Sequence, residues 1–461
     1  MPDNSAMTSR RCSFLLLLIG TLCLPALHAL EKQPASVYHA RREALAANIH
    51  GGVAVVFANQ EPDLEYQDYR QDEDFYYLTG WNEPGAALLI AGPSDPPSAT
   101  AGPIDPQGPR NYTEILFLPT RNLRTEKYTG VKLDAATPGA AQIAGVDRVM
   151  QLTDLAKMLS DMIAADRRLS RHIWAEAGST DARSLLHLVA SILGQSSLPD
   201  AGDVSAVTTP LREVKDADEI KLLRKASDAS IAAQRVMMRA VKPGVTERSV
   251  AGQMYASWLD HGCERWSYPP IVGSGPNSTT LHYMANDRTI EDGDVVVVDA
   301  ACEYSMYASD ITRTVPANGH FTARQREIYD IVLGAQKAAI DAFVAGKSKI
   351  NDRDRKDPDS LDTAAYNYIN THGKSLDGKP LGQYWLHGLG HMVGIDVHDP
   401  ADYPAVLKPG MVFTIEPGVY IPEEKIGVRI ECVFLVGQDG KLIDLVADLP
   451  HTAEEVEAAM R

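Results

Sequence analysis

The sequence has few cysteines, fewer basic than acidic residues, and one long apolar run. Cysteine supplies 5 of 461 residues, and 44 Lys and Arg stand against 61 Asp and Glu, a formal net charge of −17. An acidic chain lacks the basic surface that nucleic acid or an anionic membrane requires, so we expect neither as a partner. With 44% apolar residues, the chain is long enough for two or three domains with packed cores.

The apolar run lies at the N-terminus. It extends from Phe14 to Leu24, begins three residues after Arg11 in the pair Arg10-Arg11, and is shorter than the roughly 20 residues of a membrane span. This pattern, ending near the small residue Ala29, is typical of a secretory signal peptide. It predicts cleavage after residue 29 and a secreted or periplasmic protein with no membrane association after cleavage. The alternative is a buried N-terminal helix.

Three cysteines remain once residues 1–29 are removed: Cys263, Cys302 and Cys432. An odd, sparse and widely spaced set is not a disulfide framework, so stability should come from a hydrophobic core. Cys302 and Cys432 are near candidate metal ligands in the sequence, but the alternation of strand side chains points them to the other face. We interpret both as packing residues.

Two domains are predicted after the signal peptide, the first over residues 30–205 and the second over residues 206–461. The first has the alternating helices and strands of an α/β unit, and the residues at 202–210, whose pattern is typical of a loop, mark its end. Its predicted elements are a helix over 35–48, strands over 53–57, 86–90 and 115–118, a surface loop over 92–109, and helices over 154–165 and 182–193.

The second domain repeats one order of elements. Two helices precede strands, and then two further helices precede further strands, which predicts two similar halves facing each other with a site between them. The fold class is therefore mixed α and β. The predicted elements are helices over 218–240 and 247–261, a buried strand over 295–298, a helix over 324–345, a polar linker over 347–359 and a helix ending at 371.

Five potential metal ligands lie at or beside predicted strands of the second domain. Carboxylates in apolar strands are unfavourable unless they are paired, protonated or bound to a cation. Any one of them alone is more often a capped turn or a surface ion pair, but five together favour a metal centre. The five residues are Asp299, Asp310, His391, Glu416 and Glu431.

Four carboxylates and one imidazole suit two divalent ions about 3.5 to 4 Å apart, with carboxylates bridging them. A set rich in oxygen with one nitrogen favours Mn²⁺, while Zn²⁺ and Co²⁺ are alternatives. The expected cofactors are therefore two divalent metal ions per chain.

At this point the sequence resembles a known family, the aminopeptidase P and prolidase group of the pita-bread metallopeptidases. The resemblance runs from about residue 31 to the C-terminus, and its motifs are specific when taken together. The motifs are Asp74 to Pro84 in the first domain, and Val272 to Gly275, Leu281 to Tyr283, Asp310 to Thr314, His387 to His391 and Glu416 to Gly418 in the second.

The resemblance implies an aminopeptidase P-type N-terminal domain and a pita-bread catalytic domain with pseudo-two-fold halves. It implies that the five candidates ligate a dinuclear site, with Asp310 and Glu431 bridging. It also implies that His282, His387 and His398 surround the substrate and that Arg429 is a nearby charge. Without the resemblance, each histidine is more often an ordinary core or surface residue. Relatives are commonly dimers or tetramers, so a homodimer or homotetramer is expected.

Three features depart from the family pattern or align poorly with it. Tyr128 stands where aminopeptidase P often has a tryptophan that reaches a neighbouring subunit, so the lid that this tryptophan forms is not carried over to this chain. Residues 347–380 match the family poorly and can reshape the rim of the pocket. Asp63 is a weak candidate for binding the free amino terminus of a substrate.

The expected activity is hydrolysis of the bond between an N-terminal residue and a following proline, so the expected partners are peptides with proline in the second position. Glu416 would act as general base and then acid, with His387 and His398 stabilising charge on the substrate and His282 holding the chain near the prolyl ring. The alternative within the class is prolidase, a strict Xaa-Pro dipeptidase. Remoter alternatives are a metal-free amidinohydrolase similar to creatinase and a non-catalytic binding protein of the same fold.

Overall fold

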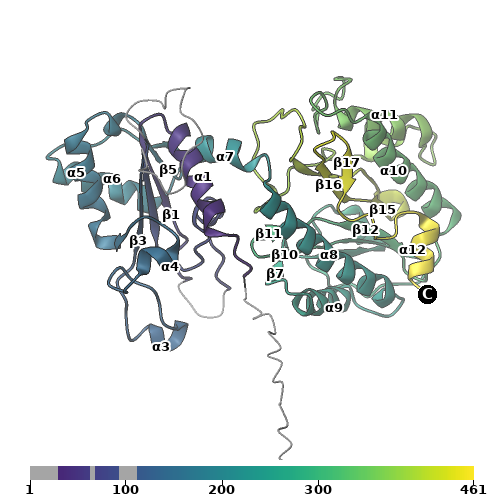
Figure 1. Ribbon diagram of the computed structural model, residues 1–461. Coiled ribbons are helices and arrows are strands. Elements are labelled where there is room, and N and C mark those ends of the chain that lie inside the picture. The colour runs from purple at the N-terminus through teal and green to yellow at the C-terminus, as the bar shows by residue number, and fades with distance from the viewer. Residues whose placement is uncertain (1–29, 63–67, 93–111) are drawn as a thin grey trace, which may run out of the picture.

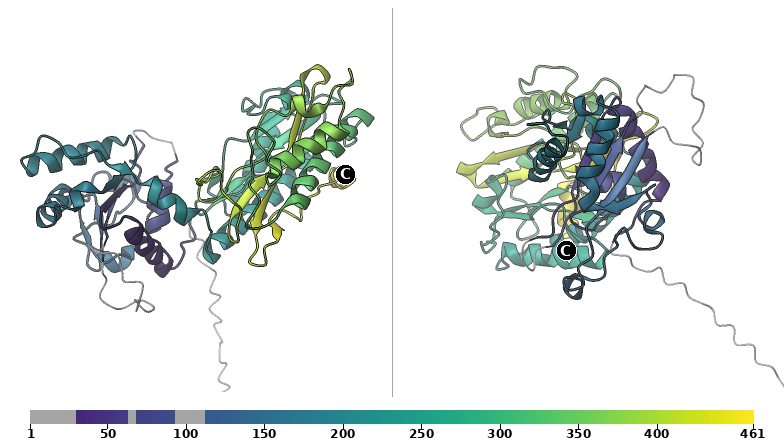
Figure 2. Two further views of the ribbon diagram at one scale, coloured as in Figure 1. Left: turned by 90° about the horizontal axis from the view of Figure 1, so that it is seen from above. Right: turned by 90° about the vertical axis from the view of Figure 1, so that its left-hand side faces the viewer.

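The computed structural model of the chain describes residues 30–62, 68–92 and 112–461. The predicted signal peptide, Asp63 and almost all of the predicted loop at 92–109 lie outside these residues. The described chain forms two lobes side by side, the first made by its N-terminal part and the second by its C-terminal part, as Figures 1 and 2 show. None of the described helices is long and apolar enough to cross a membrane.

The N-terminal lobe is a mixed sheet with helices on both faces. Its strand order is β4-β3-β2-β1-β5-β6, antiparallel among β1, β2 and β3 and parallel elsewhere. The strands are β1 (Val53–Phe57), β2 (Ala87–Ala91), β3 (Thr113–Leu118), β4 (Val149–Gln151), β5 (Ile173–Ala175) and β6 (Gly202–Asp203). The helices are α1 (Ala35–Asn48), α2 (Glu73–Thr79), α3 (Glu126–Thr129), α4 (Ala140–Ala144), α5 (Leu155–Ala165), α6 (Thr180–Ile192) and α7 (Ser205–Arg212).

Strand alternation divides the core of this lobe in two. Val53, Val55 and Leu89 pack against α5 and α6 on one face of the sheet. Ala54, Val56 and the neighbouring side chains on the other face join a core that includes α1, α2 and part of the C-terminal lobe. The sheet is therefore buried on both sides, which agrees with its nearly continuous apolar strands.

The C-terminal lobe repeats a pair of helices followed by strands, as predicted. The first half has α8 (Ala217–Ala240), α9 (Glu247–Asp260), β7 (Arg265–Trp266), β8 (Ile271–Ser274), β9 (Val295–Asp299), β10 (Cys302–Tyr304), β11 (Tyr307–Ala308) and β12 (Thr312–Pro316). The second half has α10 (Ala323–Ala342), α11 (Leu361–His372), β13 (Val412–Ile415), β14 (Gly418–Ile421), β15 (Ile426–Arg429), β16 (Cys432–Val436) and β17 (Leu442–Asp444), and α12 (Ala453–Ala459) ends the chain.

Strong caps begin the two long helices of this lobe. The side chain of Asp216 accepts from the backbone at the start of α8, and the Glu219 side chain accepts in return from the Asp216 N–H. Thr322 and Gln325 make the same reciprocal pair at the start of α10. Each capping box satisfies backbone donors that the first turn of a helix leaves free, which fixes where these helices begin.

Two interpretations made from the sequence were wrong. Residues 202–210 are not a loop, because Gly202–Asp203 pairs with β5 and α7 follows with Pro210 inside it. Cys302 is not only a packing residue, since it forms a disulfide with Cys263 across 39 residues of sequence. Cys432 is a buried free thiol, as a packing residue would be. The predicted domain boundary at 205/206 falls at the start of α7 and stays a prediction.

Candidate metal centre

The five candidate ligands line one cavity of about 480 Å³ in the C-terminal lobe. Four of them are placed by strand ends. Asp299 ends β9, Asp310 comes two residues before β12, Glu416 directly follows β13, and Glu431 lies between β15 and β16. His391 lies in the segment before β13, where its N–H donates to Thr414 Oγ1 at 3.0 Å.

Two buried glutamines hold these strand ends in matching ways. Gln234 on α8 donates from Nε2 to the carbonyls of Ala300 and Ile311, at 2.9 and 3.1 Å, and these residues follow Asp299 and Asp310. Gln336 on α10 donates to the carbonyls of Ile415 and Ile430, at 2.9 and 3.2 Å, which precede Glu416 and Glu431. Each half therefore uses one helix glutamine to hold the strand ends beside its carboxylate pair, through the carbonyls after the carboxylates in the first half and before them in the second.

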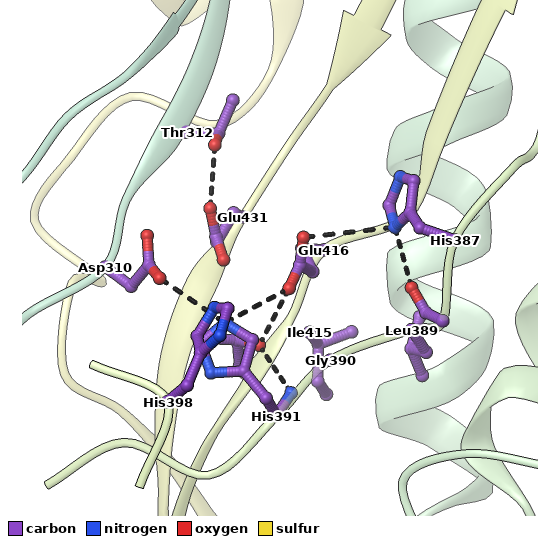
Figure 3. A network of polar contacts seen from close by, with 12 residues as sticks. Asp310, Thr312, His387, Leu389, Gly390, His391, His398, Ile415, Glu416 and Glu431 are labelled. Atoms are coloured by element: carbon purple, nitrogen blue, oxygen red, sulfur yellow. Dashed lines mark hydrogen bonds and ion pairs between the residues drawn. The ribbon is translucent and has the colours of Figure 1, made fainter. Parts of the chain in front are cut away.

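The imidazole of His391 lies between two carboxylates (Figure 3). Its Nε2 is 3.4 Å from Asp310 Oδ2 and 3.4 Å from Glu416 Oε1. Its Nδ1 is 3.0 Å from the carbonyl of Met392, which fixes the proton on Nδ1 in the neutral ring and turns Nε2 toward the carboxylates. This is the orientation in which a histidine binds a metal through Nε2.

Tyr268 connects two of the carboxylates. Its hydroxyl lies 2.6 Å from Asp299 Oδ1 and 2.5 Å from Asp310 Oδ1. Burial and these two carboxylates raise the pKa of Tyr268 well above its ordinary value, so the hydroxyl keeps its proton and acts as the donor. The carboxylates of the first half are thus held near each other.

Arg429 supplies the positive charge of the site. Its Nη2 donates to Asp299 Oδ2 at 2.6 Å, and its Nε donates to Thr312 Oγ1 at 3.1 Å. Thr312 in turn donates to Glu431 Oε2 at 2.7 Å. The side chain of Arg429 is buried, so its guanidinium is an effective partner for the carboxylates on both halves.

The carboxylates carry more negative charge than the surrounding protein balances. Burial, together with repulsion between neighbouring carboxylates, raises the pKa of Asp299 and Glu431, and it raises the pKa of Glu416 to about 7. Burial disfavours the His391 imidazolium, yet Asp310 and Glu416 raise its pKa to about 9. A proton on His391 takes the place that a cation would fill.

The donor set therefore fits divalent cations. Ligand atoms of Asp310, His391 and Glu431 lie within 4.8 Å of one another, with Asp299 and Glu416 beside them in the cavity. Four carboxylates face one guanidinium, and closely spaced anions of this kind are stable together when cations neutralise them.

The three candidate histidines, His282, His387 and His398, also line this cavity, and each has different contacts. His387 Nε2 accepts from the Tyr420 hydroxyl at 2.9 Å while its Nδ1 donates to the Gly388 carbonyl at 2.7 Å. Burial, with help from the Arg429 charge, lowers the pKa of His387 to about 3, so the ring is neutral at neutral pH. The His398 ring lies 4.0 Å from the His391 ring, and His282 is an exposed residue on the cavity wall.

Comparison with known proteins agrees with this geometry. Residues 221–438 match metallopeptidase family M24, and residues 38–172 match the aminopeptidase P N-terminal domain. Xaa-Pro aminopeptidase of Escherichia coli strain K12 is 33% identical over 456 residues, covering 92% of this chain and 97% of that protein. The chain belongs to the aminopeptidase P family.

Other members of the family agree in sequence and in structure. Xaa-Pro aminopeptidase of Haemophilus influenzae is 31% identical over 94% of this chain and 98% of its own. The low-pH form of E. coli aminopeptidase P superposes with a TM-score of 0.80 at 30% identity, over 93% of this chain and 99% of that one. A zinc-substituted form of the E. coli enzyme in complex with product superposes with a TM-score of 0.77 at 29% identity, with the same coverage.

The structure places in one cavity the five ligands indicated by the residue pattern and the four further residues, His282, His387, His398 and Arg429, that the resemblance implied. Both lines of reasoning missed several residues that support them. Tyr420, on β14 and four residues after Glu416, joins His387 to Arg429. Asn351 also escaped notice, although its amide accepts from the Leu389 N–H at 2.7 Å and donates to the Gly390 carbonyl at 2.6 Å. It lies in the poorly matching segment 347–380, which therefore does form part of the cavity wall.

Proposed function

We propose that this chain uses two divalent metal ions, Mn²⁺ in the cell, to remove an N-terminal residue that precedes proline. As a member of its family, the chain is a metal-dependent exopeptidase of the Xaa-Pro aminopeptidase type. The observation that carries the proposal is the convergence of Asp299, Asp310, His391, Glu416 and Glu431 in one cavity. Asp310 and Glu431 are proposed to bridge the two ions.

Divalent ions at such a site lower the pKa of water and polarise the carbonyl of the bond that is cleaved. Oxygen ligands outnumber nitrogen by four to one among the five residues, which favours Mn²⁺ over Zn²⁺ or Co²⁺.

Glu416 is the proposed proton carrier. It accepts the proton of the attacking water and passes it to the leaving prolyl nitrogen. A carboxylate within hydrogen-bond reach of the attacking water can act in this way as general base and then general acid. Thr414 Oγ1 donates to Glu416 Oε1 at 3.2 Å and so holds this oxygen in place.

The histidines are proposed to bind the substrate. Neutral His387 and His398 offer hydrogen bonds to the peptide and to charge that develops on its carbonyl oxygen, and His282 lies against the prolyl side. Arg429 donates to Asp299 and to the Tyr420 hydroxyl, and because that hydroxyl contacts His387, Arg429 orients His387 through Tyr420. Because the proline nitrogen of the cleaved bond has no N–H, this site has no need to accept a hydrogen bond from it.

A metal-titrated assay on peptides of two, three and more residues with proline second tests this function. The expected result is release of the free N-terminal residue from tripeptides and longer peptides, with activity that disappears on chelation and returns with Mn²⁺. Cleavage of dipeptides alone, or fewer than one metal ion per chain in the active protein, contradicts the proposal.

We propose that the chain is exported from the cytoplasm. Support comes from Arg10 and Arg11 before the apolar run, and from the Cys263–Cys302 disulfide, because disulfides persist in oxidising compartments. Mass analysis of the protein recovered from periplasmic and extracellular fractions should show an N-terminus near residue 30. Recovery of the intact chain from the cytoplasm contradicts export.

We further propose a homodimer or homotetramer. The segment around α3 extends from the N-terminal lobe (Figure 1) and exposes apolar side chains, with Tyr128 82%, Val131 76% and Leu123 70% exposed. Apolar groups gathered on a projection are suited to contact a second copy of the chain. Light scattering on a sizing column should give two or four times the monomer mass. The Tyr128→Ser variant should give a lower mass, because it weakens the contact between subunits.

A further inference from the structure

A second cluster of potential ligands lies behind the catalytic cavity. Cys432 begins β16, Asp444 ends β17, and His451 lies in the segment before α12. Cys432 Sγ is 2.9 Å from His451 Nε2, and Asp444 Oδ2 is 3.5 Å from the same nitrogen. Ligand atoms from all three residues lie within 4.8 Å of one another.

The cluster does not share the catalytic cavity. Glu431 lines that cavity, and the next residue, Cys432, does not, since successive side chains in a strand point to opposite faces. Phe434, two residues further on, shares the face of Cys432 and pairs with Asp444 across the strands. Together with Asp444 and His451 it lines a separate cavity of about 270 Å³.

Arg313 determines which atoms of the cluster are free to accept. A guanidinium can only donate, so the 3.0 Å contact from Arg313 Nη2 means that His451 Nε2 presents a lone pair. Four other contacts hold Arg313: Nε donates to the Pro450 carbonyl at 2.7 Å, Nη1 donates to the carbonyls of Thr312 and Glu431 at 3.0 and 2.7 Å, and Nη2 also donates to Cys432 Sγ at 3.7 Å. When an ion binds, Nη2 can give up its contacts with His451 and Cys432 while Nε and Nη1 keep Arg313 anchored.

The cluster is open on one side. The side chains of Asp444 and His451 are 22% and 23% exposed, while Cys432 is buried behind them. An ion can therefore enter past the carboxylate and imidazole, reach the sulfur, and keep a water molecule as a fourth ligand on the open side.

We propose that Cys432, Asp444 and His451 form a second metal site, which binds Zn²⁺ or another divalent ion with affinity for sulfur. On binding, the Cys432 thiol loses its proton to solvent as the metal–sulfur bond forms, while Asp444 Oδ2 and His451 Nε2 donate lone pairs. One sulfur, one nitrogen and one oxygen favour a softer ion than the oxygen-rich catalytic set does. The two sites should therefore differ in the metals they prefer.

Sulfur gives the second site a signal of its own. No cysteine lines the catalytic cavity, and Cys263 and Cys302 are joined in a disulfide, so Cys432 is the one thiol among the described residues. A sulfur-to-cobalt charge-transfer band in the near ultraviolet can therefore come only from Cys432. The experiment is a Co²⁺ titration, without reductant, of the signal-processed enzyme already loaded with Mn²⁺.

We expect the band to grow to saturation with one Co²⁺ per chain. Cys432→Ser should abolish the band, and unchanged catalytic metal content would show that the variant is folded. Asp444→Asn should keep the band and weaken Co²⁺ binding by about 10-fold or more, because even loss of a group behind a ligand has that effect. The proposal is overturned if the wild-type enzyme gives no band, if the band survives in Cys432→Ser, or if Asp444→Asn binds Co²⁺ as tightly as the wild type.

Discussion

At the scale of single residues, Glu416 is the group on which the proposed chemistry depends most. It lies 3.4 Å from His391 Nε2 through one oxygen, while its other oxygen is 4.0 Å from His387 Nδ1. Its carboxylate therefore stands between the proposed metal ligands and the proposed substrate-binding histidine. The other three acids lining the cavity have different contacts: Asp299 and Asp310 with Tyr268, Asp299 also with Arg429, Asp310 also with His391, and Glu431 with Thr312.

Replacing Glu416 by Gln removes the proton carrier and keeps the shape of the side chain. Turnover of an Arg-Pro-Pro peptide should fall to below a few per cent of wild type, a fall of about 10²-fold or more, as expected for loss of general acid–base catalysis. Steady-state kinetics with metal analysis of the same sample measures this. Glu423→Gln, at an exposed position outside the cavity, is the control and should leave kcat unchanged.

Tyr268 permits a test that separates metal binding from catalysis. Tyr268→Phe removes a hydroxyl that holds Asp299 and Asp310, so these carboxylates lose their shared donor. We expect metal affinity to fall by about 10- to 100-fold, with activity recovered at high Mn²⁺. Calorimetric metal titration measures the change, and Tyr128→Phe, on the exposed segment near α3, provides the matched control. An unchanged affinity would show that Tyr268 has no part in holding the ligands.

The sequence indicated these residues unequally, for a physical reason. Asp299, Glu416 and Glu431 stand out because each directly adjoins a run of apolar strand residues, which is a local pattern. Tyr268 has no such pattern, since its partners are 31 and 42 residues away. The Cys263–Cys302 disulfide also could not be predicted from a local pattern. It forms because of where α9 ends relative to β10, which depends on the tertiary structure.

At the scale of secondary structure, the two buried glutamines of α8 and α10 link helix packing to the site. Each spans two strand ends and donates to two main-chain carbonyls, of which that of Ile311 also accepts from the Ala300 N–H at 3.1 Å. Gln234 and Gln336 hold equivalent places in the two halves, so the halves can be compared by matched substitutions.

Gln234→Leu and Gln336→Leu should each lower the free energy of unfolding by about 1 to 3 kcal/mol, because each removes two hydrogen bonds to buried main-chain carbonyls. Urea denaturation followed by circular dichroism measures the change. Gln253→Leu on the exposed face of α9 should change stability by less than about 0.5 kcal/mol. Equal losses for Gln253→Leu and the buried variants would show that the effect comes from helix propensity rather than from the lost contacts.

Most elements could be predicted from local signals, and their arrangement could not. The helix predicted over 218–240 is α8 (Ala217–Ala240), which Asp216 caps, and the strand predicted over 53–57 is β1. Helix α7 was missed because Pro210, a helix breaker in most contexts, lies inside it. The order of six strands in the N-terminal sheet depends on pairings between distant segments, which no local pattern contains.

At the scale of the whole molecule, a buried ionic network joins the two lobes. Arg212, the last residue of α7, donates to Asp74 Oδ1 of the N-terminal lobe at 2.8 Å and to Asp399 Oδ1 of the C-terminal lobe at 2.7 Å. Lys215 Nζ donates to Asp399 Oδ2 at 2.8 Å. Asp74 opens the first motif of the family resemblance, and through Arg212 this residue supports the lobe interface. Asp399 also directly follows His398, which fixes the segment that carries this histidine.

Asp399→Asn should show how far this network stabilises the fold. The ordinary pKa of an Asp side chain is about 3.9. Burial alone would raise the pKa of Asp399, but Lys215 and Arg212 lower it below that ordinary value. The stability contributed by the ionised carboxylate is therefore full above about pH 4 and is lost as the pH falls through the lower, folded-state pKa. Near neutral pH, we expect the free energy of unfolding of the wild type to exceed that of Asp399→Asn by about 3 to 5 kcal/mol, because the variant leaves buried cations unpaired.

Urea unfolding of both proteins at a series of pH values measures this difference. It should be constant from neutral pH down to about pH 4 and should shrink below that, where the wild-type carboxylate becomes protonated. A difference that grows on acidification would contradict the assigned sign. Asp402→Asn, close in sequence and outside this network, is the control.

The core that the lobes share also limits how such a chain can change over evolutionary time. Leu45 and Tyr76 of the N-terminal lobe belong to the same buried cluster as Val393, Val412 and Leu435 of the C-terminal lobe. Neither lobe is therefore an interchangeable module, because each presents an apolar face that only its own companion covers. Recombination that pairs one lobe with a foreign catalytic unit would expose that face, so the two lobes are expected to be inherited together and to vary in step along their junction.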